Sequence, residues 1–180
     1  MNYFRNILLF LTILLTTTNS FGWTGKVASV INGDTMHVLH DKKEVQVCLY
    51  GVETPEESQP YGRKAKKIIS ALVAGKTIDV SIIDRNRSGC DAGLVTVGSK
   101  NMNRTLVETG YAWVDDQFCK QSFCGDWKGL ELQAKSAKIG LWQDASPTPP
   151  WQWRRGNNIL TGRTKRTKSK NPNLLGVGPN

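Results

Sequence analysis

The sequence has few of the residues that thiolate and imidazole chemistry need. Only two histidines, His37 and His40, occur among 180 residues, and no two of the four cysteines are spaced as CxxC. A structural zinc site takes four Cys or His ligands, commonly with a CxxC-type pair among them. Zinc binding is therefore disfavoured, and a thiol-redox role is disfavoured by the same missing pair.

Beyond its N-terminus, the sequence lacks any apolar run long enough to span a bilayer. Residues 1–22 differ, because Arg5 precedes the apolar run Ile7–Leu15 and small and polar residues follow it. This pattern is typical of a secretory signal peptide cut before Trp23, and it predicts a secreted or periplasmic protein with no membrane contact after cleavage. An uncleaved membrane anchor stays an alternative, since no further charged residue lies in this segment.

All four cysteines lie after this segment, where export would place them in an oxidising compartment. Thiols there tend to pair, so the sequence predicts two disulfides. The cysteines are Cys48, Cys90, Cys119 and Cys124.

The positive charge of the chain is concentrated at its C-terminal end. Of the net charge of +9, seven basic residues lie from Trp151 onward, where no acidic residue occurs. With Arg5 also set aside, only +1 remains for Trp23 to Pro150. From Ser146 the sequence shows no periodicity, so we expect the domain to end at Arg155 and residues 156–180 to form a basic, disordered tail.

Between these ends, apolar spacing predicts five short strands and three helices. Alternating or β-branched runs predict strands at Val27–Ile31, Thr35–His40, Glu44–Tyr50, Thr77–Ile83 and Gly93–Val97. Helical spacing with glycine stops predicts helices at Tyr61–Ala74, Asn103–Glu108 and Trp127–Lys138. We read Arg85–Cys90 as a polar loop. Without βαβ alternation, these elements favour an α+β domain, a small barrel with helices packed on it.

Three carboxylates are candidates for chemistry. Asp34 follows Asn32-Gly33, which is first of all a turn, and Glu53 and Glu56 flank a Thr-Pro dipeptide at the end of a strand. If the strand end lies beside Asp34, the three meet, and such a cluster needs a cation such as Ca²⁺ or Mg²⁺. A solvated acidic loop is the alternative.

The motifs together resemble the staphylococcal nuclease family. The resemblance runs in family order from Thr24 to Arg155 and is carried by VINGDTMHV at Val30–Val38, LYGVETPE at Leu49–Glu56, YGRKAKK from Tyr61, LVETGYAWV at Leu106–Val114, IGLW at Ile139–Trp142 and PPWQWRR at Pro149–Arg155. It implies a five-stranded OB-type barrel with three helices, and Ca²⁺-dependent hydrolysis of DNA and RNA phosphodiester bonds.

The resemblance also implies roles for the acidic residues. Asp34, Glu53 and the Thr54 carbonyl fall on the family's metal ligands, although Glu53 stands where the family normally has aspartate. Glu56 falls on the residue held to activate the attacking water, a role that suits a carboxylate near a bound metal.

Two arginines complete the family's site, and both are cysteines in this chain. Cys48 stands at the arginine position of the third strand, and Cys90 stands at the arginine position of a later loop. Since two residues that converge on one phosphate have both become cysteine, we predict a Cys48–Cys90 disulfide and a second bridge between Cys119 and Cys124. Two unpaired thiols are the alternative.

Two hypotheses of function follow, with nucleic acid or another anionic polymer as partner. The first is an exported, Ca²⁺-dependent nuclease with residual activity. The second is a catalytically silent, monomeric nuclease-like domain whose basic residues bind nucleic acid or another anionic polymer. The candidate binding residues are Arg87, Arg154, Arg155, Arg163, Lys165 and Arg166. Loss of both arginines predicts strongly reduced or absent hydrolysis, because a single arginine on the transferring phosphoryl group is worth about 10³ to 10⁵ in rate.

Overall fold

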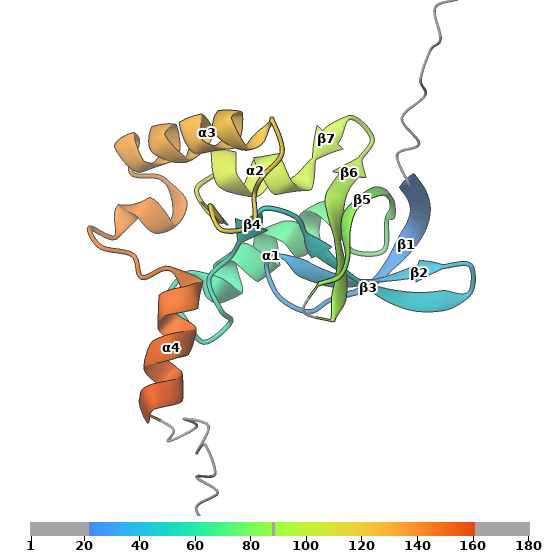
Figure 1. The fold of residues 1–180 in the computed structure, drawn as a ribbon, viewed down its shortest axis with the longest axis horizontal. Helices are drawn as coiled ribbons and strands as arrows, with labels where there is room; N and C mark the ends of the chain where they lie inside the picture. The colour runs from blue at the N-terminus through green and yellow to red at the C-terminus, as the bar shows by residue number, and fades with distance from the viewer. Residues whose placement is uncertain (1–21, 88, 161–180) are drawn as a thin grey trace, which may run out of the picture.

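Eight strands and four α-helices make up the part of the chain that the computed structural model describes, residues 22–87 and 89–160 (Figure 1). The strands are β1 (Gly22–Val30), β2 (Thr35–His40), β3 (Lys43–Leu49), β4 (Val52–Glu53), β5 (Thr77–Arg87), β6 (Cys90–Val97), β7 (Lys100–Asn101) and β8 (Trp113–Val114). The helices are α1 (Gly62–Val73), α2 (Met102–Glu108), α3 (Cys124–Ser136), the 3-10 turn η1 (Gly140–Gln143) and α4 (Pro150–Leu160).

A closed barrel of five strands forms the centre of the domain. The order along the sheet is β3-β2-β1-β5-β6, with β7 added beyond β6, and parallel pairing of β3 with β6 closes the ring. In that closure Cys48 lies beside Ala92 and Leu49 beside Gly93. The predicted α+β class and five-stranded OB-type barrel are confirmed.

Apolar side chains fill the barrel and bind the helices to it. Val38, Val47, Val80 and Val95 are fully buried, as the alternating strand pattern predicts. The buried residues Ala65, Ile69 and Val73 lie on one face of α1, which matches the predicted helical spacing. Burial of this face fixes α1 against the barrel at β1 and against α2.

A second, smaller cluster lies outside the barrel. It is centred on Trp113, Ala134, Leu141 and Trp142, and Trp151 packs against it with its ring centroid 6.4 Å from that of Trp113. Because Trp151 lies in the first turn of α4, this contact attaches α4 to the domain.

The structure contains three short strands that the sequence did not predict, β4, β7 and β8, and it differs from the prediction in three larger features. First, there is a fourth α-helix: α4 begins at Pro150, inside the stretch that we expected to be irregular, and ends at Leu160, five residues beyond the predicted boundary at Arg155. Proline is tolerated at the first helical position, where no internal N–H bond is lost, and the packing of Trp151 supplies the stabilisation that periodicity did not indicate.

Second, the predicted polar loop Arg85–Cys90 is wrong. Strand β5 continues to Arg87 and β6 begins at Cys90, so these two residues pair directly and only a short turn separates the strands. Third, β1 begins at Gly22 rather than Val27 and pairs with β5 from Ser81 to Thr77.

Residues 1–21 of the predicted signal segment, and residues 161–180 of the predicted tail, lie outside the described residues. No helix within residues 22–87 and 89–160 is long and apolar enough to cross a membrane.

Candidate functional site

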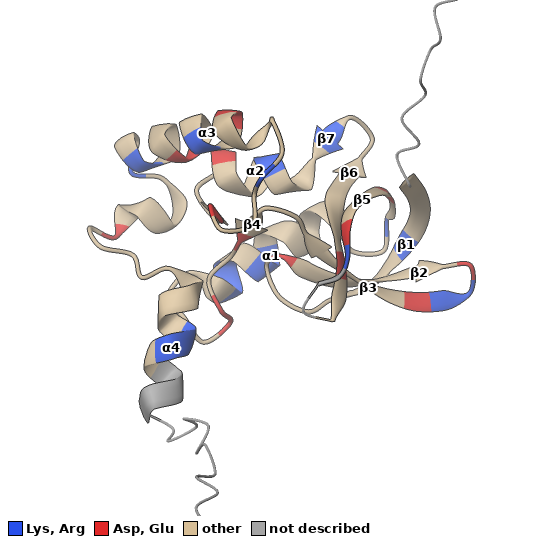
Figure 2. Cartoon of the chain, in the orientation of Figure 1, with Lys and Arg blue, Asp and Glu red and all other residues tan. Residues whose placement is uncertain are grey.

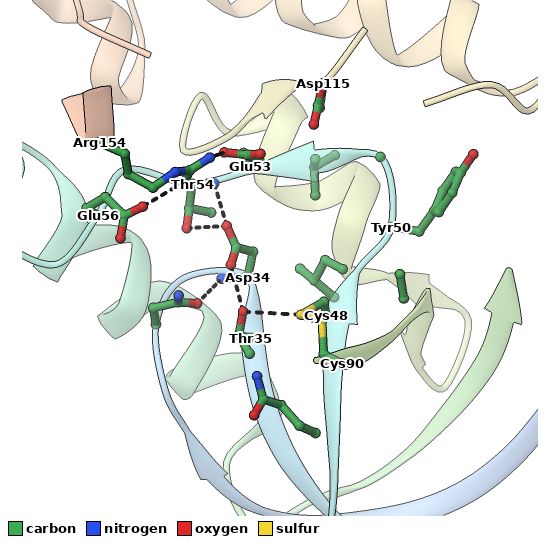
Figure 3. Close-up of a pocket in the computed structure, with 16 residues that line it drawn as sticks. Asp34, Thr35, Cys48, Tyr50, Glu53, Thr54, Glu56, Cys90, Asp115 and Arg154 are labelled. Carbon is green, nitrogen blue, oxygen red and sulfur yellow. Dashed lines mark hydrogen bonds and ion pairs between the residues drawn. A yellow bond between two sulfur atoms is a disulfide. The ribbon is translucent and has the colours of Figure 1, made fainter. Parts of the chain in front are cut away.

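A pocket of about 260 Å³ opens beside the closure of β3 and β6 (Figure 3). It brings together most of the predicted site residues, although they come from distant parts of the chain. Its lining includes Asp34, Cys48, Glu53, Thr54, Glu56, Cys90, Asp115 and Arg154. We call Asp34, Glu53 and Glu56 the acidic edge of this pocket.

Asp34 is held in place by the turn that precedes β2. Its backbone N–H donates to the side-chain oxygen of Asn32 over 3.0 Å, which closes the turn. Its carboxylate accepts from the backbone N–H and the hydroxyl of Thr54, at 2.7 and 2.9 Å, and from the Thr35 hydroxyl at 2.9 Å. A Cβ on Gly33 would lie only 2.5 Å from the Thr54 hydroxyl oxygen, so the glycine lets Thr54 approach Asp34 this closely.

Two carboxylates of the acidic edge, those of Asp34 and Glu53, are poorly solvated. Burial raises the pKa of Asp34, against the opposing hydrogen bonds from Thr54 and Thr35, and the charge of Glu56 raises it further. Burial also raises the pKa of Glu53; the Arg154 hydrogen bond and charge oppose this shift, whereas Asp115 and Asp34 reinforce it. Asp34 and Glu53 therefore ionise at a cost, which a nearby positive charge reduces.

Arg154 reaches this edge from α4. Its Nη1 donates to Oε1 of Glu56 over 2.7 Å and its Nη2 donates to Oε2 of Glu53 over 2.8 Å (Figure 3). Although burial lowers the pKa of Arg154, its two glutamate partners raise it overall. We predicted only that Arg154 contacts nucleic acid, and its place within the acidic edge was missed. The WQWRR motif indicated a basic segment, but nothing in it indicated that the segment folds back over Glu53.

The opposite wall of the pocket is a disulfide. Cys48 and Cys90 are bonded, with their Cα atoms 5.9 Å apart, and the Thr35 hydroxyl lies 3.6 Å from the Cys48 sulfur. Cys119 and Cys124 form the second bridge, with Cα atoms 5.8 Å apart. Both predicted disulfides are confirmed, and no described cysteine is free.

Asp115 adds a fourth carboxyl group to the pocket. It is only 7% exposed, and its side chain accepts from the backbone N–H of Gln117 over 3.0 Å. A negative charge in this position disfavours a bound phosphate.

A buried asparagine that the sequence prediction did not include supports the floor of the site. Asn103, fully buried at the start of α2, donates to the carbonyl oxygens of Tyr50 and Gly93 and accepts from the N–H of Val95. It thereby ties the turn between β3 and β4 to β6. A single polar residue inside a helix carries no sequence signal of such a role.

The remaining predicted binding residues are not gathered at the pocket. Arg155 is exposed on α4, and Figure 2 shows basic residues on α4 and on the neighbouring end of α1. Arg87 ends β5, and its side chain is not among those described. Arg163, Lys165 and Arg166 lie outside the described residues.

The acidic edge has the type of ligand that calcium takes, but not the arrangement. Calcium binds about six to eight oxygen atoms, largely carboxylates and carbonyls. In this structure the Asp34 carboxylate accepts hydrogen bonds from Thr54 and Thr35. Glu53 and Glu56 form ion pairs with Arg154. Within residues 22–87 and 89–160, no group of three or more Asp, Glu, His or Cys residues is arranged to hold a metal ion. As arranged, these residues do not fit calcium, whose binding stays a prediction.

Comparison with known proteins agrees with this barrel and this set of motifs. Residues 46–144 match the family described as staphylococcal nuclease homologue. An uncharacterized endonuclease from Escherichia coli O157:H7 is 38% identical over 131 residues, which cover 72% of this chain and 84% of the relative. The ParB protein of Escherichia coli is 32% identical, covering 74% and 80%. A micrococcal nuclease from Shigella flexneri is 27% identical, covering 76% and 83%.

The fold and the pocket define a nuclease-type barrel with an acidic edge, and the comparisons identify its family. The chain belongs to the staphylococcal nuclease family. Membership of a family whose members include proteins named as nucleases supports nuclease activity in general, with nucleic acid as substrate or partner.

Proposed function

We propose that this chain is an exported member of the nuclease family that engages nucleic acid but hydrolyses phosphodiester bonds at a strongly reduced rate or not at all. The observation that carries the proposal is the Cys48–Cys90 disulfide in the wall of the pocket. The N-terminal sequence and the two disulfides support export, since both fit an oxidising compartment.

The physical reason is the missing positive charge. Phosphoryl transfer is accelerated mainly by cationic groups placed on the non-bridging oxygen atoms of the phosphate. A disulfide carries no charge and donates no hydrogen bond, so this wall offers the phosphate nothing in place of two guanidinium groups. Among the described residues that line the pocket, Arg154 is the one Lys or Arg, and it already pairs with Glu53 and Glu56.

The acidic edge keeps a group that can accept a proton. Glu56 occupies the position that the family resemblance gives to the general base, and its bond to Arg154 uses one of its two carboxylate oxygens. A carboxylate oxygen that faces a bound water can take a proton from it. We therefore expect residual hydrolysis, where present, to depend on Glu56.

A second candidate function is binding without catalysis, with the tail supplying the affinity. The C-terminal distribution of charge favours it, because residues 156–180 contain five basic residues and no acidic one. Such a segment binds phosphate backbones through counterion release, without base specificity. The basic residues of the tail are Arg163, Lys165, Arg166, Lys168 and Lys170.

Cleavage and binding assays on the purified protein separate these two functions. Supercoiled plasmid is incubated with calcium and either the wild-type chain or Glu56→Gln, and oligonucleotide binding is measured in parallel. Cleavage that disappears in Glu56→Gln supports a working acidic edge; equal, background-level nicking by both proteins supports binding alone. Deleting residues 161–180, which keeps α4 whole and removes all five of these basic residues, should weaken binding and flatten its salt dependence. Binding that is unchanged by the deletion would contradict the role given to the tail.

A further inference from the structure

The acidic edge already holds a cation, and the chain itself supplies it. One guanidinium bridges two carboxylates, since Nη1 of Arg154 bonds to Glu56 and Nη2 bonds to Glu53, at 2.7 and 2.8 Å. Charge-assisted N–H···O bonds of this length are stronger than those between neutral groups. Figure 3 shows the guanidinium lying between the two glutamates, on the side of the pocket that α4 closes.

The charges around the pocket explain why a cation belongs there. Four carboxyl groups, those of Asp34, Glu53, Glu56 and Asp115, line it, against the single basic side chain of Arg154 among the described residues. Carboxylates this close together repel one another, and a nearby positive charge lowers that cost. A divalent ion would provide more positive charge, but it would need the same glutamate oxygens.

The placement of Arg154 does not depend on these ion pairs alone. The Trp151 ring packs edge-on against Trp113, and the side-chain amide of Gln59 donates to the backbone carbonyl of Thr148 just before α4. These contacts anchor the start of the helix independently of the guanidinium. Removing the Arg154 charge should therefore leave α4 in place.

We propose that Arg154 is the resident cation of the acidic edge and competes with divalent metal ions for Glu53 and Glu56. A metal ion then binds only to molecules in which the guanidinium has moved off these oxygens. Arg154 acts as a positioning residue that sets how tightly the site takes a metal. This inference deepens the proposed function, because it concerns the same carboxylates, yet metal affinity can be measured without any hydrolysis.

The solvent exposure of the partners limits the size of the effect. The side chains of Arg154, Glu53 and Glu56 are 48%, 22% and 33% exposed, so each ion pair is partly solvated and of modest strength. Apparent affinity falls in proportion to the fraction of molecules able to bind. With two such ion pairs, Arg154 would be off both glutamates in about one molecule in ten. Metal binding would then be about tenfold weaker than in a protein without the Arg154 bridge.

Calorimetric titration of calcium chloride into the purified full chain tests this competition. Arg154→Gln removes the bridge, and Arg155→Gln is the matched control, because it removes the same charge from the next position of α4. We expect the calcium Kd to fall about tenfold in Arg154→Gln and to change by less than about twofold in Arg155→Gln. Arg154→Lys keeps the charge but replaces the planar guanidinium with a compact ammonium on a shorter side chain, and it should give an intermediate Kd.

Calcium affinity that is unchanged or weaker in Arg154→Gln overturns the inference. Equal tightening in Arg155→Gln also overturns it, since net charge rather than the bridge would then be responsible. If Arg154→Gln does not fold, as judged by circular dichroism, the Arg154→Lys comparison decides. Plasmid cleavage measured on the same samples tests the proposed function separately: rapid cleavage by the wild-type chain contradicts that function and leaves the calorimetric result for Arg154 unaffected.

Discussion

The two walls of the pocket have different chemistry on one backbone framework. On the acidic edge, Asp34, Thr54 and Glu56 keep the residue types that the family resemblance assigns to metal and water chemistry, and three hydrogen bonds fix Asp34. On the opposite wall, the Cys48–Cys90 bond stands where the family resemblance places two arginines. The barrel tolerates this exchange because Cys48 lies on β3 and Cys90 at the start of β6, the two strands that close it. Where the family resemblance places phosphate-binding arginines, this chain instead has a covalent link between β3 and β6.

The largest effect is expected from restoring charge to the disulfide wall. The double substitution Cys48→Arg and Cys90→Arg should raise the rate of plasmid cleavage by about 10³-fold, because two guanidinium groups would then face the phosphate. The double substitution Cys48→Ser and Cys90→Ser is the control, since it removes the bridge and adds no charge. Equal rates for the two double variants would show that the acidic edge has also lost its competence.

The second effect concerns stability and compares the two disulfides. The Cys48–Cys90 bridge spans 42 residues and the Cys119–Cys124 bridge only 5. By loop-closure entropy, serine substitution of the first pair should lower the free energy of unfolding by about 4 kcal/mol, and that of the second by about 2 kcal/mol. Chemical denaturation followed by tryptophan fluorescence measures both. A larger loss from the short loop would contradict the structural role assigned to the disulfide wall.

The smallest effect is expected at the acidic edge. Because the folded-state pKa of Asp34 is raised, its carboxyl group favours folding at low pH, and this contribution is lost as pH rises through the folded pKa. Asp34→Asn removes the cost of ionisation and should raise the thermal unfolding temperature at about pH 7, with the gain vanishing below about pH 4. A gain that persists in acid would mean that packing, rather than charge, limits stability at Asp34.

Local patterns in the sequence were enough to predict much of this molecule. The spacing of Ala65, Ile69 and Val73 predicted α1, and two cysteines at positions that converge in the family predicted the Cys48–Cys90 bond. The first is a regularity within one stretch, whereas the second joins positions 42 residues apart and came from the family resemblance. The acidic edge was predicted in the same way, from residues that flank two turns.

Features that depend on tertiary contacts were not predicted. Helix α4 has a proline start and no run of apolar positions, and its anchor is a contact between Trp151 and Trp113. The fork from Arg154 to Glu53 and Glu56 follows from that placement and from no local pattern. Likewise, β5 extends to Arg87 through polar residues because β6 supplies its hydrogen-bonding partner.

The most direct test of the account is a single-turnover cleavage measurement. A short oligonucleotide is saturated with the wild-type protein in calcium, binding is verified by anisotropy, and the first-order rate of cleavage is compared with that of Glu56→Gln. The account predicts a bound oligonucleotide that the wild-type chain cleaves within about tenfold of the Glu56→Gln rate, because the disulfide wall contributes no charge to the transition state. A bound oligonucleotide cleaved several orders of magnitude faster by the wild-type chain would contradict it.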